Sequence, residues 1–316
     1  MADLPTNADI EAAYDRIRTV IRRTPLLELA ADELGVPGRV LLKLELTQHT
    51  GSFKARGALN SVLSTGLSAG LSTGTPPGVA AVSGGNHGAA VAWAAQRAGI
   101  SADVFVPSMA TPEKLDRVRG YGATTHLVEG SMGTLFAEGL AWAEAHDVPL
   151  IHPFDQWGTV CGQGTVGLEL AEQVPDADLV LVGCGGGGLY AGMAIGLTGH
   201  SKVQPVEPAT CPSLHAALEA GSPVPVEVSG VGADSLGAPQ AGDIAFEVAR
   251  RADTTPILVG DQAIVEARQW LWQRCRLLAE PGASAALAAL MTRKVQVAAG
   301  DTVVVVVSGG NNATFP

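Results

Sequence analysis

Short runs of β-branched and aliphatic residues alternate along this chain with longer stretches in which apolar residues recur at helical spacing. An uninterrupted apolar run is typical of a buried strand, whereas a repeat of three to four residues indicates a helix with one buried face. Strands are expected at 40–45, 79–83, 102–106, 124–128, 150–153, 179–182, 203–206, 257–259 and 302–307. Helices are expected at 9–22, 52–63, 87–98, 134–145, 261–276 and 282–291. Strands that alternate with helices predict parallel sheets covered by helices.

Two boundaries divide this alternation. The segment 64–78, STGLSAGLSTGTPPG, has the Ser, Gly, Thr and Pro content of a linker, and it precedes a compact β-α-β-α run that ends near Pro149. The pattern resumes at 151–157 and continues without another linker. We therefore predict an α/β protein made of two doubly wound domains with mainly parallel sheets. The larger domain would consist of residues 1–74 and 150–316, and the smaller, mobile substrate domain of residues 75–149.

Charge and composition exclude several classes of partner. The 316 residues carry a formal net charge of -11, so the surface would repel nucleic acid and anionic lipid. Every apolar run falls short of the roughly 20 residues that span a bilayer. The first residues, MADLPTNADI, lack the basic and apolar stretches of a secretory signal, so a cytoplasmic location is expected. The four cysteines contain no CxxC pair and are interpreted as reduced thiols.

Four segments place a turn, rich in glycine in three of them, at the carboxyl end of an expected strand, which is where doubly wound sheets bind ligands. In DLVLVGCGGGGLYAG, the four consecutive glycines 185–188 let the backbone approach an anion closely, and a phosphate would fit there. In GVAAVSGGNHG, the backbone amides of 83–87 suit a carboxylate. VVVVVSGGNN brings Ser308 to the edge of the sheet, and VLLKLELTQHTGSFKARG leads to Lys54.

Each of these segments also has an ordinary structural interpretation. Asn86 is a residue type that commonly caps helices, and most lysines extend into solvent, as Lys54 could. The GxGxxG-like run 183–188, with Glu207 at the next strand end, leaves binding of NAD open. No single segment therefore decides the function.

The combination of segments favours pyridoxal phosphate. Lys54 stands at a helix N-terminus beside Phe53, and both the helix dipole and partial burial should lower its pKa and make it a nucleophile for carbonyls. Phe53 supplies an aromatic neighbour for a ring, and Asn86 an amide for a phenolate oxygen. Ser308 supplies a hydroxyl for a ring nitrogen, and 185–188 a site for a phosphate. NAD would leave Lys54 and Ser308 without a role.

The same segments resemble one family over nearly the whole chain. TGSFKARGALN, SGGNHG, CGQGTVGLEL, GCGGGGL, VEPATCPSLHAAL, AEPGASAALAAL and SGGNN are similar, in this order, to the signatures of the serine/threonine dehydratases. These are pyridoxal-phosphate enzymes of the second fold type, whose architecture is like that of the tryptophan synthase β chain. The resemblance implies pyridoxal 5'-phosphate as cofactor, with Lys54 as the catalytic Schiff-base lysine. It implies cofactor contacts from Phe53, Lys54, Asn86, Gly185, Gly186, Gly187, Gly188, Leu189, Gly237 and Ser308, and substrate contacts from Ser83, Gly84, Gly85, Asn86 and His87.

The reaction implied by the resemblance is β-elimination from L-threonine or L-serine, with ammonia and 2-oxobutanoate or pyruvate as products. A neutral hydroxyl at Ser308, in place of a carboxylate, leaves the ring nitrogen without a fixed proton and favours expulsion of a β-leaving group. Serine racemase-like chemistry is disfavoured because Gly84 stands where similar racemases carry a second serine. Threonine synthase-like chemistry, a dehydratase for another β-hydroxy amino acid, a non-catalytic sensor and an NAD-dependent oxidoreductase are the alternatives.

The resemblance also bears on metals and assembly. Metal-responsive members place an acidic residue soon after a Glu-Pro pair, whereas this chain has Ser213 there. We expect no bound metal, although Glu207 and Cys211 are the residues that would be candidates for one. A small amino-acid substrate and a homodimer are expected, since similar proteins are usually dimeric.

Overall fold

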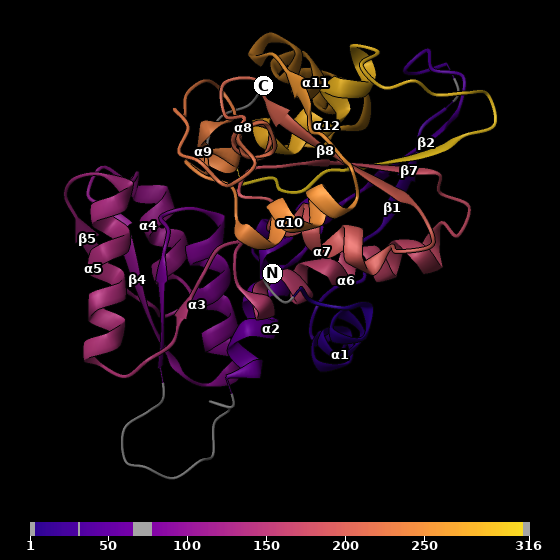
Figure 1. Ribbon diagram of the computed structural model, residues 1–316. Coiled ribbons are helices and arrows are strands. Elements are labelled where there is room, and N and C mark those ends of the chain that lie inside the picture. Colours follow the sequence, from indigo (N-terminus) through magenta and orange to yellow (C-terminus); the bar gives the residue numbers. More distant parts are fainter. Residues whose placement is uncertain (1–3, 31, 66–77, 312–316) are drawn as a thin grey trace.

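The computed structural model describes residues 4–30, 32–65 and 78–311 and contains two sheets (Figure 1). The larger sheet has six strands in the order β1-β2-β10-β7-β8-β9, and all neighbouring pairs are parallel except β1 with β2. Its strands are β1 (Leu26–Glu28), β2 (Arg39–Lys43), β7 (Leu179–Gly183), β8 (Lys202–Pro208), β9 (Ile257–Val259) and β10 (Thr302–Val306).

The smaller sheet has four parallel strands in the order β5-β4-β3-β6. They are β3 (Gly78–Val82), β4 (Ser101–Pro107), β5 (Thr124–Val128) and β6 (Leu150–Ile151). The predicted α/β class with mainly parallel sheets is thus confirmed. The exact domain boundaries stay a prediction, and most of the expected linker, residues 66–77, lies outside the described residues.

Helices cover both sheets. Figure 1 shows α3, α4 and α5 around the smaller sheet, while α11 and α12 lie on the opposite side of the larger sheet from α6, α7 and α10. The helices are α1 (Asn7–Ile17), α2 (Lys54–Ser64), α3 (Asn86–Ala98), α4 (Pro112–Arg119), α5 (Met132–Ala145), α6 (Trp157–Gln173), α7 (Gly188–Gly196), α8 (Ser213–Ala220), α9 (Ala233–Leu236), α10 (Asp243–Arg251), α11 (Asp261–Cys275) and α12 (Pro281–Met291).

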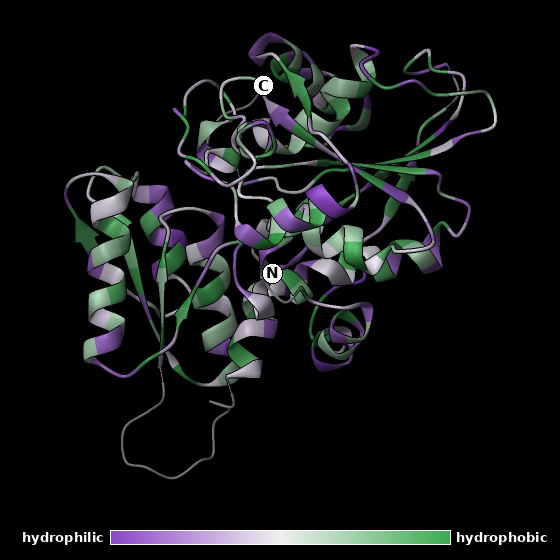
Figure 2. Cartoon of the chain, in the orientation of Figure 1, coloured by the Kyte–Doolittle hydropathy of each residue, from purple (hydrophilic) through white to green (hydrophobic). Residues whose placement is uncertain are grey.

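The valine run at the centre of the larger sheet explains its double cover. Val303 and Val305 pack on one face with residues of α11 and α12, and Val304 and Val306 pack on the other with residues of α6, α7 and α10. Successive residues of a strand face opposite sides, so a continuous apolar run serves two cores. Figure 2 shows hydrophobic colour along the middle of the larger sheet.

Several boundaries differ from those expected. Helix α1 starts earlier, because Thr6 and Asp9 form a capping box, and ends at Ile17 rather than residue 22. Helix α2 starts at Lys54, after two short 3-10 turns, η1 (Glu45–Thr47) and η2 (His49–Gly51). Positive φ angles at Thr50 and Gly51 bend the chain sharply into α2. Among the described residues, no helix combines the length and the apolar character needed to cross a membrane.

Candidate active site

Lys54 is the first residue of α2, and its ammonium points to a backbone carbonyl across the molecule. Lys54 Nζ donates a hydrogen bond to the carbonyl oxygen of Pro153 at 2.7 Å. Burial of this amine lowers the pKa of Lys54 from 10.5 to about 8. The predicted direction of the shift is correct, and burial is its cause. A usable fraction of the amine is therefore neutral, and nucleophilic, near neutral pH.

The residue after Pro153 links this amine to the glycine run 185–188. A Cβ on Gly186 would lie 2.4 Å from ring atoms of Phe154, and a Cβ on Gly188 would lie 2.5 Å from the Phe154 carbonyl oxygen. Gly187 has φ +87°, and a Cβ there would lie 2.3 Å from Cβ of Ala245. Only glycine fits at these positions.

This glycine run forms a cradle for an anion. Gly187 is the N-cap of α7 and provides no side-chain hydrogen bond, so the first amides of the helix, including that of Leu189, face the loop without a side-chain cap. Such amides, at the positive end of the helix dipole, bind phosphate. Gly185 is equally confined, since a Cβ there would lie 2.8 Å from the Leu236 carbonyl oxygen. A phosphate group fits this backbone cradle.

The expected cofactor residue Gly237 lies at the end of α9, next to this cradle. A Cβ on Gly237 would lie 2.1 Å from the Ala233 carbonyl oxygen, so the turn out of α9 also requires glycine. Leu236 contacts Gly185, and Ser235 Oγ accepts a hydrogen bond from the Gly282 backbone amide at 3.2 Å. Helix α9 therefore joins the glycine cradle to the start of α12.

Ser308 and Phe53 are neighbours, as one shared site would require. The Phe53 backbone amide donates to the Ser308 carbonyl oxygen at 3.1 Å, and Ser52 forms an isolated β-bridge with Gly309. The Phe53 ring centroid lies 5.0 Å from Lys54 Nζ. Ser308 is buried, and the buried Ser52 hydroxyl has no hydrogen-bond partner among the described residues. The turn before Lys54 and the C-terminal glycine loop thus form one wall.

Asn86 lies in a polar cluster that the sequence did not reveal. Asn86 Nδ2 donates to both carboxylate oxygens of Glu280 at 2.9 Å, and Asn311 Nδ2 donates to Asn86 Oδ1 at 2.7 Å. Burial raises the pKa of the Glu280 carboxyl. Glu280 and Asn311 lie within the segments AEPGASAALAAL and SGGNN, and the resemblance of these segments to the family was the only indication in the sequence that the two residues belong to the site. The Asn86 amide that was expected to face a phenolate oxygen binds Glu280 here.

The rest of the expected substrate loop turns between β3 and α3. The Gly85 backbone amide donates to Ser83 Oγ at 3.1 Å, and α3 begins after Gly85 without a side-chain cap. A Cβ on Gly84 would lie 2.7 Å from Val106. His87 is buried, with Nε2 2.8 Å from the Ile151 carbonyl oxygen, and burial, followed by the charge of Lys54, lowers its pKa to about 3. His87 is therefore a neutral, structurally bound histidine near Lys54.

The two candidate metal residues have other partners. Glu207 accepts the backbone amides of Leu214 and His215 at 2.8 and 2.9 Å and so caps α8, while burial raises its pKa to about 7. Cys211 Sγ donates to the Ser229 carbonyl oxygen at 3.1 Å. In the part of the chain that the structure describes, no group of three His, Cys, Asp or Glu side chains is placed so that it could hold a metal ion.

Known proteins are similar to this chain in sequence and in fold. The family model described as "Pyridoxal-phosphate dependent enzyme" matches residues 17–309. An L-threonine ammonia-lyase of Geobacter sulfurreducens is 36% identical over 307 residues, which cover 96% of this chain and 74% of that protein. The solved T.th. threonine deaminase has a TM-score of 0.87 at 35% identity and covers 99% of this chain and 100% of its own. Maize serine racemase has a TM-score of 0.89 at 30% identity, covering 98% and 94%.

Proposed function

The chain belongs to the family of pyridoxal-phosphate dependent enzymes, and on this premise we propose that it is an ammonia-lyase acting on L-threonine, L-serine or both. The observation that carries the proposal is the connection from the Lys54 amine, through Pro153 and Phe154, to the glycine cradle at 185–188. The amine, with its lowered pKa, and the anion cradle contact two adjoining residues, and they match the aldehyde and the phosphate of the cofactor.

Pyridoxal phosphate, when bound, supplies an electron sink that weakens the bonds at the α-carbon of an amino acid. The backbone amides of 185–189 would hold its phosphate, and Lys54 Nζ would hold its aldehyde carbon. The Ser308 hydroxyl would be the partner for its ring nitrogen, and Phe53 and Gly237 would supply contacts to its ring. These roles are assigned from the wall formed by Phe53 and Ser308 and from the fit of the cradle.

Lys54 also moves the proton that the reaction requires. Once the amino group of the substrate has replaced Lys54 at the aldehyde carbon, the freed Lys54 Nζ, whose pKa is about 8, would take the proton from the substrate Cα. Backbone amides at the start of α3, in the loop 83–87, bind the substrate carboxylate, since this helix N-terminus has no side-chain cap. Asn86, held by Glu280 and Asn311, fixes the position of that loop.

The products follow from the bonds that break. Loss of the α-proton and the β-hydroxyl releases water and leaves an enamine, which water then hydrolyses to a 2-oxo acid and ammonia. L-threonine gives 2-oxobutanoate, and L-serine gives pyruvate. A neutral hydroxyl at Ser308, rather than a carboxylate, favours this elimination.

Racemisation of serine is the second candidate, because the fold is so similar to that of maize serine racemase. A racemase needs a base on each face of the substrate. Gly84 carries no side chain, and Val106 lies 2.7 Å from where its Cβ would be, so a side chain there would be crowded. The structure therefore favours elimination over racemisation.

A substrate panel tests the proposal. The purified protein is incubated with cofactor and L-threonine, L-serine, D-serine, aryl-serines or O-phosphohomoserine, and 2-oxo acid, ammonia, D-serine and threonine are measured. We expect 2-oxo acid and ammonia in equal amounts from L-threonine or L-serine, and none from a Lys54→Ala variant. D-serine as main product from L-serine would favour the racemase, and threonine from O-phosphohomoserine would refute the lyase. We further propose that the protein is cytoplasmic and forms a homodimer. Light scattering would test the dimer, and cell fractionation would test the location.

A further inference from the structure

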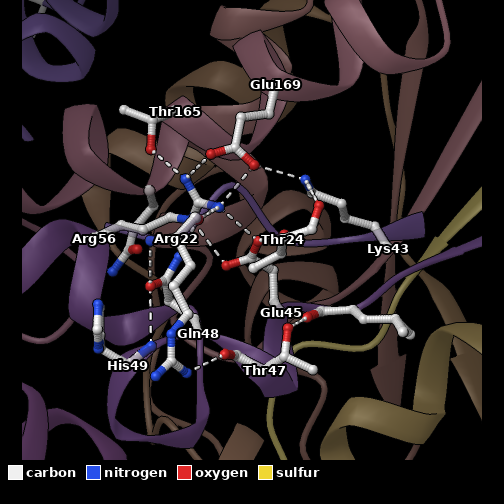
Figure 3. Close-up of polar contacts among 12 residues, drawn as sticks. Arg22, Thr24, Lys43, Glu45, Thr47, Gln48, His49, Arg56, Thr165 and Glu169 are labelled. Carbon is white, nitrogen blue, oxygen red and sulfur yellow. Dashed lines mark hydrogen bonds and ion pairs between the residues drawn. The ribbon is translucent and has the colours of Figure 1, made fainter. Parts of the chain in front are cut away.

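Arg56, two residues after Lys54, lies in a fully buried group of charged side chains (Figure 3). The Arg56 guanidinium lies between two carboxylates and binds each of them with two hydrogen bonds. Nε and Nη2 donate to Glu45 at 2.8 Å each, and Nη1 and Nη2 donate to Glu169 at 2.7 and 2.9 Å. Arg56 and Glu45 are 0% exposed and Glu169 is 1% exposed. The geometry of Arg56 is thus fixed on both sides.

A lysine completes this group. Lys43 Nζ donates to Glu169 at 2.7 Å, to the Thr24 carbonyl oxygen at 3.0 Å and to Gln173 at 2.8 Å. Two cations and two carboxylates make the cluster neutral overall. Burying charges carries a desolvation cost, and apolar side chains of similar volume often stabilise a protein as well or better. Stability alone is therefore a weak reason for this cluster.

The cluster ties the start of α2 to α6. Helix α2 has no side-chain cap at its N-terminus. Arg56 instead reaches Glu169 and Thr165 of α6, the latter at 3.2 Å, and the Gly57 amide donates to Gln163 of α6 at 3.3 Å. A Cβ on Gly162 would lie 2.6 Å from the Arg56 carbonyl oxygen, so the two helix backbones are in contact.

Helix α6 makes the same close contact with α7. A Cβ on Gly192 of α7 would lie 2.4 Å from the Val160 carbonyl oxygen, and one on Gly164 of α6 would lie 2.8 Å from the Gly192 carbonyl oxygen. Helix α6 therefore touches both the helix that begins with Lys54 and the helix that begins at the phosphate cradle. The spacing between the amine and the cradle is set through α6.

We propose that Arg56 is a positioning residue that fixes the Lys54 amine at the correct distance from the phosphate cradle 185–188. Glu45 and Glu169 hold Arg56, and α6 carries the other end of the spacing to α7. The inference rests on the cofactor role of Lys54 proposed above and does not depend on which amino acid is the substrate. Displacement of a reacting group by about 1 Å is enough to cost about 100-fold in rate.

The test compares two aldehydes that differ in the phosphate. Pyridoxal phosphate would be held both at Lys54 and at the cradle, whereas pyridoxal lacks the phosphate and makes no contact with the cradle, so the ratio of their affinities reports whether amine and cradle are correctly spaced. Borohydride-trapped adduct on Lys54 is measured by peptide mass against the concentration of each aldehyde, which requires no turnover. The variants are Arg56→Lys and the isosteric Thr165→Val. Arg16→Lys is the matched control, because Arg16 contacts the same helix through Asn60, six residues beyond Lys54.

We expect Arg56→Lys to reduce the preference for pyridoxal phosphate about tenfold or more, since one ammonium cannot bind two carboxylates bidentately. Thr165→Val should reduce it about threefold, and Arg16→Lys less than about twofold. Folded Arg56→Lys with the wild-type ratio and a lower melting temperature would show a purely structural role and overturn the inference. If Arg56→Lys does not fold, the ratio for Thr165→Val decides in the same way. Wild-type protein without any trapped adduct would instead refute the cofactor role of Lys54.

Discussion

Replacement of Gly186 by alanine would crowd the phosphate cradle without straining its backbone. Gly186 is not among the glycines with positive φ, so the effect comes from the new Cβ alone. That Cβ would lie 2.4 Å from Phe154 ring atoms. The backbone of Phe154 is held in place on both sides. Its carbonyl oxygen lies against Gly188, and the carbonyl oxygen of the preceding residue, Pro153, accepts a hydrogen bond from Lys54 Nζ. Crowding of this kind costs about 1–3 kcal/mol. If the loop relieves it by leaving the shape that binds phosphate, restoring that shape weakens the binding of pyridoxal phosphate by up to about 5- to 150-fold.

Two further alanine variants separate crowding from strain. Gly187→Ala combines a positive φ with a Cβ 2.3 Å from Ala245, and we expect the larger loss of affinity. Gly199→Ala has the same kind of φ, +81°, but nothing within 4 Å of its Cβ. It should cost about 1–2 kcal/mol of folding stability and leave the affinity for the cofactor unchanged.

Titration of each cofactor-free variant with pyridoxal phosphate, followed by tryptophan fluorescence, measures the three dissociation constants. Urea denaturation of the same samples gives the stability of each variant. A Gly186→Ala protein that binds pyridoxal phosphate as tightly as wild type would refute the assignment of the cradle. An equal loss of affinity in Gly199→Ala would show that the loss comes from general destabilisation.

Three other predictions follow from pKa shifts. Lys54→Met should raise the stability of the cofactor-free protein near pH 7, because it removes a buried charge. This gain in stability should shrink as the pH rises from about 8 to 10.5, where the folded wild type has lost the proton of Lys54. The urea midpoints measure it, and a difference between variant and wild type that is constant with pH would contradict the prediction. Burial raises the pKa of Glu207 to about 7, so the folded wild type holds this proton more tightly than the unfolded chain does. As the pH rises from 4.5 to 7, wild type should therefore lose stability relative to Glu207→Gln, and a gain of stability would be inconsistent with a buried cap. Cys161 is buried, and burial raises its pKa to about 12, so this thiol should react with a disulfide reagent far more slowly in native than in urea-denatured protein; rapid reaction of Cys161 in native protein would contradict its burial.

The sheets could be predicted because their signals are local. The valine run before Ser308 and the run at 179–182 each identify a buried strand without reference to the rest of the chain. The strand β1 was not predicted: its two leucines are followed by the charged Glu28, and it forms by antiparallel pairing with β2. Helix ends were misplaced where capping decided them, as at Thr6.

The candidate site divides in the same way. Lys54 and the glycine run were visible as short motifs, and the structure places them at the two ends of one chain of contacts through Phe154. The partners of Arg56 were not visible, because Glu169 is 113 residues away in sequence and an arginine after Lys54 and Ala55 resembles an exposed helix residue. The pairing of Asn86 with Glu280 likewise depends on a contact across 194 residues.

We infer that the Lys54 amine binds the cofactor covalently while the glycine cradle binds its phosphate. Borohydride reduction of the protein with pyridoxal phosphate, followed by peptide mass analysis, distinguishes Lys54 from the other lysines, because the chain offers five lysines as possible sites. We predict a single reduced adduct on the peptide that contains Lys54, with visible absorbance that disappears on reduction. An adduct on Lys43, Lys114, Lys202 or Lys294 in place of Lys54, or no adduct at all, would contradict the claim.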